Sequence, residues 1–430
     1  MSFWDEKTET MKPAGLEKLQ LKRLRHIVNY CYSRIPFYRE KFRQAGLKPS
    51  DIKRLDDVER IPYTTKQDLR DNYPFKMVAV PYPKINRIHA SSGTSGKPTV
   101  VVYTRGDLDV WADLMARELY MSGVRKEDTV QLIYNYAFFT GGFGFHQGAE
   151  KIGAAVIPAG VGNSRKQIQV MKDFNVSMFS STPSYALHLA EVMDELNIKS
   201  GDLKLRVGVF GAEPWSEAMR KRIENSFGID AFDNYGLSEM CGPGVCMECE
   251  EKCGMHIWGD HFLPEIVDPE SAEIADDGEL VLTTLTKEGL PLLRYKTGDI
   301  TSFISGGCSC GRTHKRIARI RGRVDDMLII KGVNVFPSHV EEIIMSFPEM
   351  GDSYQIIVSR DRQMDSLGVK IEVNPEIFTG SEVQLRDLRQ ALERELRSGL
   401  DVSVRVELVE PLSLERSAGK AKRVFDLRKE

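Results

Sequence analysis

The sequence predicts an α/β protein with two domains, and three features of the chain lead to this expectation. From residue 97 to 300, short apolar stretches alternate with longer amphipathic ones, which is typical of largely parallel sheets with flanking helices. Around 274–304 the alternation becomes strand-turn-strand and indicates a small antiparallel or barrel-like β subdomain. After Gly322 and Arg323 the pattern becomes mixed α+β. We therefore expect a large N-terminal domain over 1–322 and a C-terminal domain over 323–430.

Apolar residues at helical spacings predict amphipathic helices over 15–45, interrupted around Pro36. In the rest of the large domain the expected strands are 129–138, 154–160, 177–182, 205–213 and 229–236. The expected helices there are 107–121, one after 138, 165–173, 184–197 and 215–227. The C-terminal domain is expected to hold strands at 326–336, 353–360, 367–374 and 402–410, and helices at 337–347 and 381–398. Open parallel sheets bind ligands at the carboxyl ends of their strands, so the loops there are the candidate site.

The composition of the 430-residue chain is that of a globular protein and excludes several functions. With 59 Lys and Arg against 62 Asp and Glu, the net charge is -3, which gives no overall reason to bind nucleic acid or an anionic membrane. No stretch approaches the ~20 apolar residues of a membrane span, and the first residues do not resemble a signal peptide. We expect a cytoplasmic protein that holds any anionic ligand by local contacts.

The segment from Ser91 to Thr104 combines hydroxyls, glycines and one lysine between an expected strand over 86–90 and a β-branched run. Glycines let backbone N–H groups approach phosphate oxygens, hydroxyls donate further hydrogen bonds and Lys97 supplies positive charge. This is not a Walker A loop, because Pro98 follows the lysine. Taken alone, the segment could equally be a polar hairpin. The predicted triphosphate cradle consists of Ser91, Ser92, Gly93, Thr94, Ser95, Gly96 and Lys97.

Six segments occur along the chain in a fixed order: SSGTSGKPT, GAEPW, NYGLSE, RYKTGD, GRVDDMLIIKGVNV and SAGKAKRV. In this order and spacing they resemble the acyl-adenylate-forming superfamily of acyl-CoA synthetases, adenylation domains and luciferases. Further segments, IPFYRE, TPSYAL, LLRYKTGD and VFPSHVEE, are similar to the phenylacetate-CoA ligases within that superfamily. The resemblance covers nearly the whole chain.

The resemblance implies a two-step reaction with ATP, magnesium and coenzyme A. A small aromatic carboxylic acid would first form an acyl-adenylate with release of pyrophosphate, and the CoA thiol would then displace AMP. One alternative is an adenylyltransferase that acts on a different acceptor, such as a deazaflavin cofactor. A second, from another class, is a nucleotide-binding regulatory protein without catalysis. A homodimer is compatible with the resemblance.

The resemblance also assigns roles to single residues. Asp299 would bind the ribose hydroxyls, Glu239 would bind magnesium, and Ser238 would touch the α-phosphate. The adenine slot would have two edges, made of Gly211, Ala212 and Glu213, and of Asp233, Asn234, Tyr235 and Gly236. Lys420 resembles the catalytic lysine, with Lys422 and Arg423 as rivals, and Arg323 would reach the nucleotide as the C-terminal domain closes. Asp325 resembles the hinge about which this mobile domain rotates.

Aromatic residues around a glycine-rich bend, in YNYAFFTGGFGFH, suit a planar aromatic acid. Any of these rings could instead belong to the core. The candidate contacts to the acid are Tyr136, Phe139, Gly142 and Ala212.

The seven cysteines suggest reduced thiols, and six of them lie in two clusters. Cys246, Cys249, Cys253, His256 and His261 are close in sequence, and Cys308-x-Cys310 follows about fifty residues later. Two short-spaced clusters of soft ligands are the usual layout of a structural zinc site. The resemblance implies the ligand set Cys249, His256, Cys308 and Cys310, with Cys246 and Cys253 as extra thiols and His314 as a less favoured substitute. Thiols without a metal are the alternative.

Overall fold

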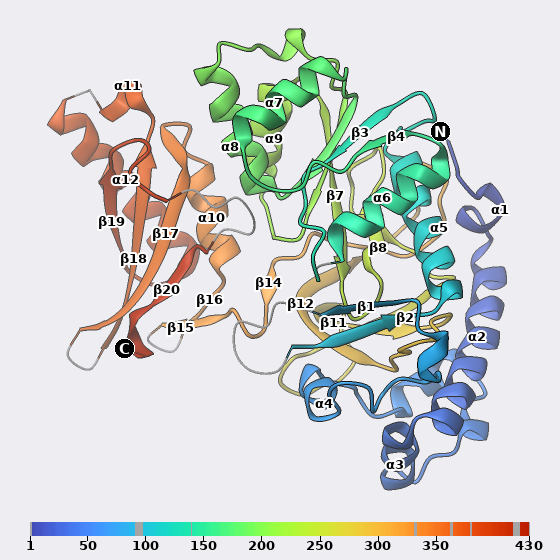
Figure 1. Cartoon of the computed structure of the whole chain (residues 1–430). Helices are drawn as coiled ribbons and strands as arrows, with labels where there is room; N and C mark the ends of the chain where they lie inside the picture. Colours follow the sequence, from blue (N-terminus) through green and yellow to red (C-terminus); the bar gives the residue numbers. More distant parts are fainter. Residues whose placement is uncertain are drawn as a thin grey trace.

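A computed structural model describes residues 2–90, 98–138, 140–330, 333–361, 364–378, 381–415 and 422–429. Helices cover one side of the large domain, seen at the right of Figure 1: α1 (Glu6–Glu9), α2 (Pro13–Arg34) and α3 (Pro36–Gln44). Because proline favours the first turn of a helix, α2 ends before Pro36 and α3 begins on it. The expected interruption is therefore confirmed. None of the helices within the described ranges has both the length and the apolar composition needed to cross a bilayer.

In the described part of the chain, the main sheet has twelve strands, and one half of it is parallel. Adjacent strands run in the order β4 (Ala155–Ile157), β3 (Thr129–Leu132), β5 (Met178–Ser181), β6 (Val207–Gly211) and β7 (Asp230–Leu237). The flanking helices are α5 (Arg105–Met121), α6 (Gly141–Ile152), α7 (Ser164–Asp173), α8 (Pro183–Glu195) and α9 (Glu217–Phe227). The strand expected over 129–138 is wrong in length, because the chain leaves the sheet after Leu132 and turns before α6.

The other half of this sheet is antiparallel and begins where β7 pairs with β8. Its strands are β8 (Gly242–Glu248), β9 (Met255–Ile257), β10 (Phe262–Val267), β11 (Asp277–Thr284), β12 (Tyr295–Ile304), β13 (Arg316–Ile317) and β14 (Gly322–Arg323). The strand-turn-strand expectation at 274–304 is confirmed by β11 and β12. The same sheet therefore carries the parallel strands and the β subdomain.

Several short elements lie beside this sheet. A hairpin of β1 (Arg87–Ala90) and β2 (Val100–Tyr103) flanks the 91–97 segment in the sequence. Helix α4 spans Lys66–Asp71. Single-turn helices occupy Pro49–Asp51, Leu55–Arg60, Tyr82–Lys84, Ser200–Asp202 and Leu427–Lys429.

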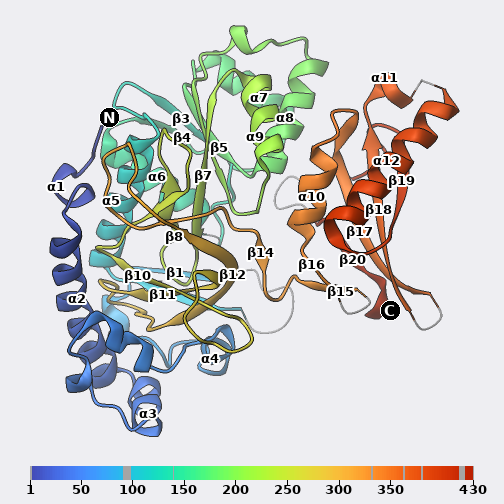
Figure 2. The same cartoon turned by 180° about the vertical axis from the view of Figure 1, so that it is seen from behind.

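The C-terminal region forms a separate α+β layer with its own apolar core, on the other side of the large domain from α1 and α2 (Figures 1 and 2). Its sheet has the order β19 (Val404–Val409), β18 (Met364–Val373), β17 (Met350–Asp361) and β20 (Val424–Asp426). Its helices are α10 (Pro337–Met345), α11 (Pro375–Phe378) and α12 (Glu382–Leu400). The predicted fold class is thus confirmed.

One strand expected in this region is wrong. Residues 326–336 form two short strands, β15 (Leu328–Ile330) and β16 (Val333–Val335), which pair antiparallel with each other. Leu328, Ile330 and Val335 are buried, whereas Ile329 and Asn334 are exposed. Each strand has only three residues, and burial alternates within each of them, so their apolar residues together resembled one longer strand in the sequence.

Candidate active site

The carboxyl ends of β6 and β7 bring together the two segments expected to form the adenine slot. A Cβ atom on Gly211 would lie 2.2 Å from the carbonyl oxygen of Asn234, so glycine is required for this approach. The next residue, Ala212, has a φ of 72°, a left-handed conformation that is costly for a residue with a side chain. Such strained backbone at a strand end is characteristic of functional sites.

A charged cluster lies behind this slot and includes residues that sequence reasoning missed. Asp233 lies 3.4 Å from the Nε of Arg319, and its backbone N–H donates to Glu248 at 2.8 Å. Arg220 donates to both carboxylate oxygens of Glu248 at 2.7 Å. Burial, with the nearby charge of Glu248, raises the pKa of Asp233 to about 6. Arg319 also donates to the carbonyl of Trp215 at 2.9 Å, which ties Asp233 to the segment that follows Glu213.

Asp299 is buried and held by two partners. The Tyr235 hydroxyl donates to Oδ2 at 2.6 Å, and the Arg323 guanidinium donates to Oδ1 at 2.8 Å. Burial raises the pKa of Asp299, whereas Arg323 and the Tyr235 hydroxyl oppose that rise. Arg323 lies opposite Asp299 in the pairing of β14 with β12, and it also bonds Asp325 at 2.8 Å. Three of the predicted residues, Tyr235, Asp299 and Arg323, are therefore in direct contact.

Glu239 is buried just beyond β7, and its segment is held by two further residues that sequence reasoning missed. The buried ammonium of Lys287 donates to the carbonyls of Glu239, at 3.2 Å, and Met240. Burial, together with the neighbouring Glu239 carboxylate, raises the pKa of Tyr295. Burial lowers the pKa of Lys287. A lysine inside the apolar run around LTKEGLPLL was the one available signal in the sequence.

A cavity of about 120 Å³ lies between the start of α6 and the ends of β6 and β7. It is lined by small and aromatic residues that include Tyr134, Thr140, Gly141, Phe145, Ala212 and Ser238. Ala212 was a predicted contact to the acid, whereas Tyr136 and Gly142 do not line this cavity. Tyr136 packs against Phe143 with ring centroids 5.2 Å apart. The cavity offers apolar walls of the kind that bind a small planar ring.

Some predicted residues lie outside the described ranges: the whole Ser91–Lys97 cradle, Phe139 and Lys420. Phe138 is described, and its side chain is 70% exposed. A second cavity, of about 1060 Å³, lies between the large domain and the C-terminal region. Trp215, Ile300, Arg319, Phe336 and His339 are among its lining residues. It opens where Arg319 donates to the carbonyl of Trp215, beyond the end of β6.

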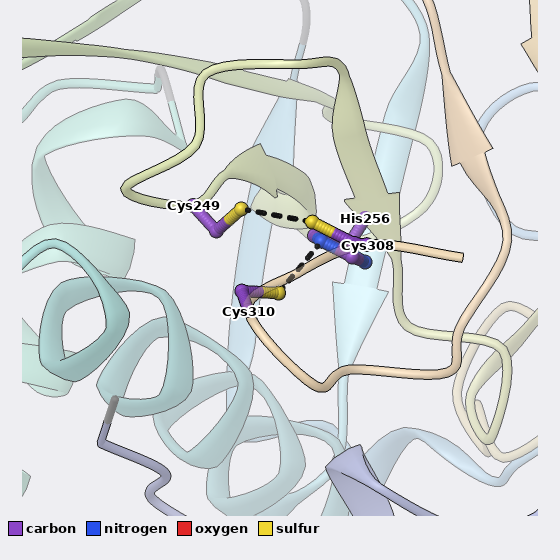
Figure 3. Close-up of side chains that lie close together, drawn as sticks. All are labelled: Cys249, His256, Cys308 and Cys310. Carbon is purple, nitrogen blue, oxygen red and sulfur yellow. Dashed lines mark hydrogen bonds between the residues drawn. The ribbon is translucent and has the colours of Figure 1, made fainter. Parts of the chain in front are cut away.

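Four of the predicted metal ligands converge (Figure 3). One ligand atom from each of Cys249, His256, Cys308 and Cys310 lies within 4.8 Å of all the others. The Sγ atoms of Cys249 and Cys308 are 3.6 Å apart, and Sγ of Cys310 is 3.4 Å from Nε2 of His256. Three of the four side chains are buried, and Cys308 is half-buried.

The other candidate ligands have different surroundings. The His261 ring lies 3.1 Å from the Asp260 carboxylate and forms a hydrogen bond with the Thr286 hydroxyl. The two ring nitrogens of His314 form hydrogen bonds with the backbone N–H of Gly259 and the carbonyl of Thr8. Cys246 is buried in the main core. Cys253 is exposed, with its Sγ 3.9 Å from that of Cys308 and 2.8 Å from Nη1 of Arg316.

Glu118 joins the end of β7 to the residues that follow β9, the strand that carries His256, and sequence reasoning missed it. This fully buried carboxyl group accepts hydrogen bonds from the Asn234 amide and from Nε1 of Trp258, the latter at 3.0 Å. Burial raises the pKa of Glu118 to about 8 from an ordinary value of 4.5. At pH values between these two pKa values, Glu118 keeps its proton in the folded chain and releases it in the unfolded chain. The group's contribution to stability therefore falls as the pH rises.

We expect Glu118→Gln to flatten the fall in melting temperature between pH 5 and 8, because an amide does not ionise. The stability effect of this ionisation is on the order of a few kcal/mol. Melting curves of the two proteins at several pH values measure the difference. Glu127→Gln, which removes an exposed carboxylate, is the control and should behave as the parent. If the melting temperature of Glu118→Gln falls with pH as steeply as that of the parent, the raised pKa of Glu118 is refuted.

Two protein families match the chain: the AMP-binding enzyme family over residues 17–284, and the AMP-binding enzyme C-terminal domain over 332–428. The phenylacetate-coenzyme A ligase of Escherichia coli is 49% identical over 425 residues, covering 98% of this chain and 97% of that protein. The phenylacetate-coenzyme A ligase of Aromatoleum evansii is 47% identical, with coverages of 98% and 97%.

A 2-hydroxyisobutyryl-CoA ligase in its postadenylation state, with 2-hydroxyisobutyryl-AMP, is similar over the whole fold. The TM-score is 0.94 at 32% identity, covering 99% of this chain and 93% of that one. The same ligase in its thioesterification state, at the same coverage, gives a TM-score of 0.74. The domains of this chain are therefore arranged as in the postadenylation state. These matches confirm the resemblance of the motifs, and the chain belongs to the phenylacetate-coenzyme A ligase branch of the AMP-binding enzymes.

Proposed function

We propose that the protein is an ATP-dependent aryl-acid CoA ligase that forms an acyl-adenylate and then an acyl-CoA. The structural observation that supports this most directly is the contact of Asp299 with Tyr235 and Arg323, next to the strand that lines the small cavity. Full-length relatives that are phenylacetate-coenzyme A ligases favour this reaction over an adenylyltransferase with a deazaflavin acceptor. A non-catalytic nucleotide-binding protein would have no chemical need for Glu239, Asp299 and Lys420 together.

In the first step, a carboxylate oxygen of the acid attacks the α-phosphorus of ATP, and pyrophosphate leaves. Asp299 would accept hydrogen bonds from the ribose hydroxyls, because its two oxygens have about four acceptor positions and two are used by Tyr235 and Arg323. The cavity beside Ala212 would hold the aromatic ring away from water. In the second step the CoA sulfur attacks the acyl carbon, and AMP leaves.

Magnesium would be held by Glu239, since hard cations prefer carboxylate oxygens, and it would neutralise charge on the phosphates. Lys287 would hold the backbone of Glu239 in place through its contact with that carbonyl, and Tyr295 would lie beside the carboxylate. The Ser91–Lys97 cradle and Ser238 would contact the phosphates. The adenine would lie between the 211–213 and 233–236 edges.

We also propose the division into domains at 1–322 and 323–430, with Asp325 as the hinge. Strand β14 pairs with β12 of the main sheet, whereas Leu328 of β15 already belongs to the C-terminal core. Asp325 lies between them and bonds the Arg323 side chain. Rotation there would move the C-terminal domain between the two half-reactions.

Cys249, His256, Cys308 and Cys310 would hold one structural zinc ion. Tetrahedral coordination with ordinary bond lengths separates two sulfurs by about 3.8 Å and a sulfur from a nitrogen by about 3.6 Å. The observed separations of 3.6 Å and 3.4 Å fit this geometry. Four protein ligands leave no open position, so the ion would join β8 and β9 to the 308–310 loop without taking part in catalysis.

The substrate is tested by incubating the protein with ATP, magnesium, CoA and a panel of carboxylic acids that includes phenylacetate. Mass spectrometry of the thioesters should detect phenylacetyl-CoA or a close aryl analogue, with AMP as the coproduct. AMP transfer without any thioester would instead select the adenylyltransferase. The cytoplasmic location and a homodimer stay predictions, which cell fractionation and the mass in solution would test.

A further inference from the structure

Arginine contacts join the large domain to the C-terminal domain in the present arrangement. On the large domain, Arg222 of α9 forms an ion pair with Asp352 and donates to the carbonyls of Met350 and Phe347, at 3.2 and 3.3 Å. About a quarter of each charged side chain of the pair is exposed. Helix α10 packs against α9 at the same boundary (Figures 1 and 2).

A second arginine crosses the boundary from the other side. Arg423 precedes β20 and follows Lys420 by three residues. Its Nη2 donates to the Ser184 hydroxyl of α8 at 3.1 Å. The backbone N–H of Ser184 donates to the Glu213 carboxylate at 2.8 Å, and its hydroxyl bonds the same oxygen. Arg423 is thus connected through Ser184 to one edge of the adenine slot.

Within its own domain, Arg423 is held on several sides. Its guanidinium lies 4.1 Å from the centre of the Tyr354 ring, and its Nε is 3.8 Å from the Glu341 carboxylate. Its backbone carbonyl accepts a hydrogen bond from Ile356 at 2.7 Å, which anchors it to β17. The position of this arginine is therefore set by the C-terminal domain, so its bond to Ser184 forms only in one orientation of that domain.

The similarity to the 2-hydroxyisobutyryl-CoA ligase identifies that orientation. TM-scores of 0.94 and 0.74 against two states of one protein place this chain in the postadenylation arrangement. We propose that Arg222 and Arg423 are positioning residues that hold the C-terminal domain in the arrangement for acyl-adenylate formation. Arg423 would fix the downstream end of the segment that carries Lys420. This inference rests on the proposed function of that lysine.

Contacts that exist in only one arrangement change the population of that arrangement when they are lost. Arg222→Ala and Ser184→Ala should therefore slow pyrophosphate release from ATP and phenylacetate, measured without CoA, by about tenfold each. Thioester formation from synthetic phenylacetyl-AMP and CoA should be unchanged or faster. Ser184→Ala leaves the core of the C-terminal domain intact, because Ser184 lies in the large domain.

A matched control removes a positive charge without removing a boundary contact. Lys221→Ala changes the exposed residue next to Arg222. This control should retain the parent rate of pyrophosphate release. A purely structural role would lower both half-reactions together with the melting temperature, and that result would overturn the proposal, as would rates equal to those of Lys221→Ala.

Small-angle X-ray scattering of the full chain separates this inference from the proposed function, because it needs no turnover. The scattering of the parent and of Lys221→Ala should match the arrangement described here. That of the Arg222→Ala/Ser184→Ala double variant should depart from it at an unchanged melting temperature. An unchanged profile for the double variant would contradict the inference even if the ligase activity is established. A shifted profile in a protein without ligase activity would support the boundary contacts and refute the proposed reaction.

Discussion

Replacing Lys420 by alanine is expected to slow acyl-adenylate formation about 100-fold or more, while thiolysis of preformed acyl-AMP is largely retained. The lysine would bridge the carboxylate and α-phosphate oxygens as negative charge is redistributed between them. Losing one such transition-state contact commonly costs about this factor. In the proposed cycle, thiolysis follows rotation of the C-terminal domain, so the lysine would no longer be at the site. Pyrophosphate release and thioester formation from synthetic acyl-AMP measure the two steps separately.

Lys422→Ala is the control for this substitution, since it removes a neighbouring lysine from the same basic segment. Lys422 is exposed, and its ammonium lies 4.9 Å from the centre of the Phe425 ring. Its replacement should leave both half-reactions close to those of the parent. If Lys422→Ala instead slows acyl-adenylate formation and leaves thiolysis unchanged, the assignment of the catalytic lysine is wrong by two residues.

The second large effect concerns the cysteine cluster, for which we expect one tightly held zinc ion per chain. The Cys308→Ser/Cys310→Ser double variant should lose the metal and melt at a temperature lower by several degrees. Binding to the folded state alone stabilises it by about 4 kcal/mol when free zinc is 1,000 times the dissociation constant. Loss of the metal should also loosen the packing of the N-terminal residues. Arg312 follows Cys310 closely and donates to the buried carboxylate of Glu9 at 2.7 Å. Elemental analysis measures the zinc content, and melting curves measure the loss of stability.

Cys253→Ser is the matched control for the zinc prediction. Its thiol is exposed and near Cys308, yet it does not belong to the group of four. The variant should keep one zinc per chain and the parent melting temperature. Zinc well below one equivalent in the chelator-washed parent, or full zinc in the Cys308/Cys310 double variant, would eliminate the proposed site.

Local patterns in the sequence predict most of the secondary structure and the positions of the motifs. Pro36 separates α2 from α3, and the alternation of apolar stretches locates β5, β6 and β7 with their helices. Local patterns fail where two very short strands follow each other closely, as β15 and β16 do, or where an apolar segment continues beyond its strand, as after Leu132. Apolar periodicity reports which face is buried, but it does not report where the chain leaves a sheet.

The sequence by itself determined the α/β class, the order of the motifs and the choice, among more candidates, of the four cysteine and histidine side chains that the fold brings together. Only the tertiary structure decided which residues support the site. Lys287 meets the carbonyl of Glu239 across 48 positions, Glu118 meets Trp258 across 140, and Arg222 meets Asp352 across 130. The physical reason is that buried polar and charged groups need partners, and these partners come from distant segments that approach only when the sheet and the second domain pack. No local periodicity encodes such pairs.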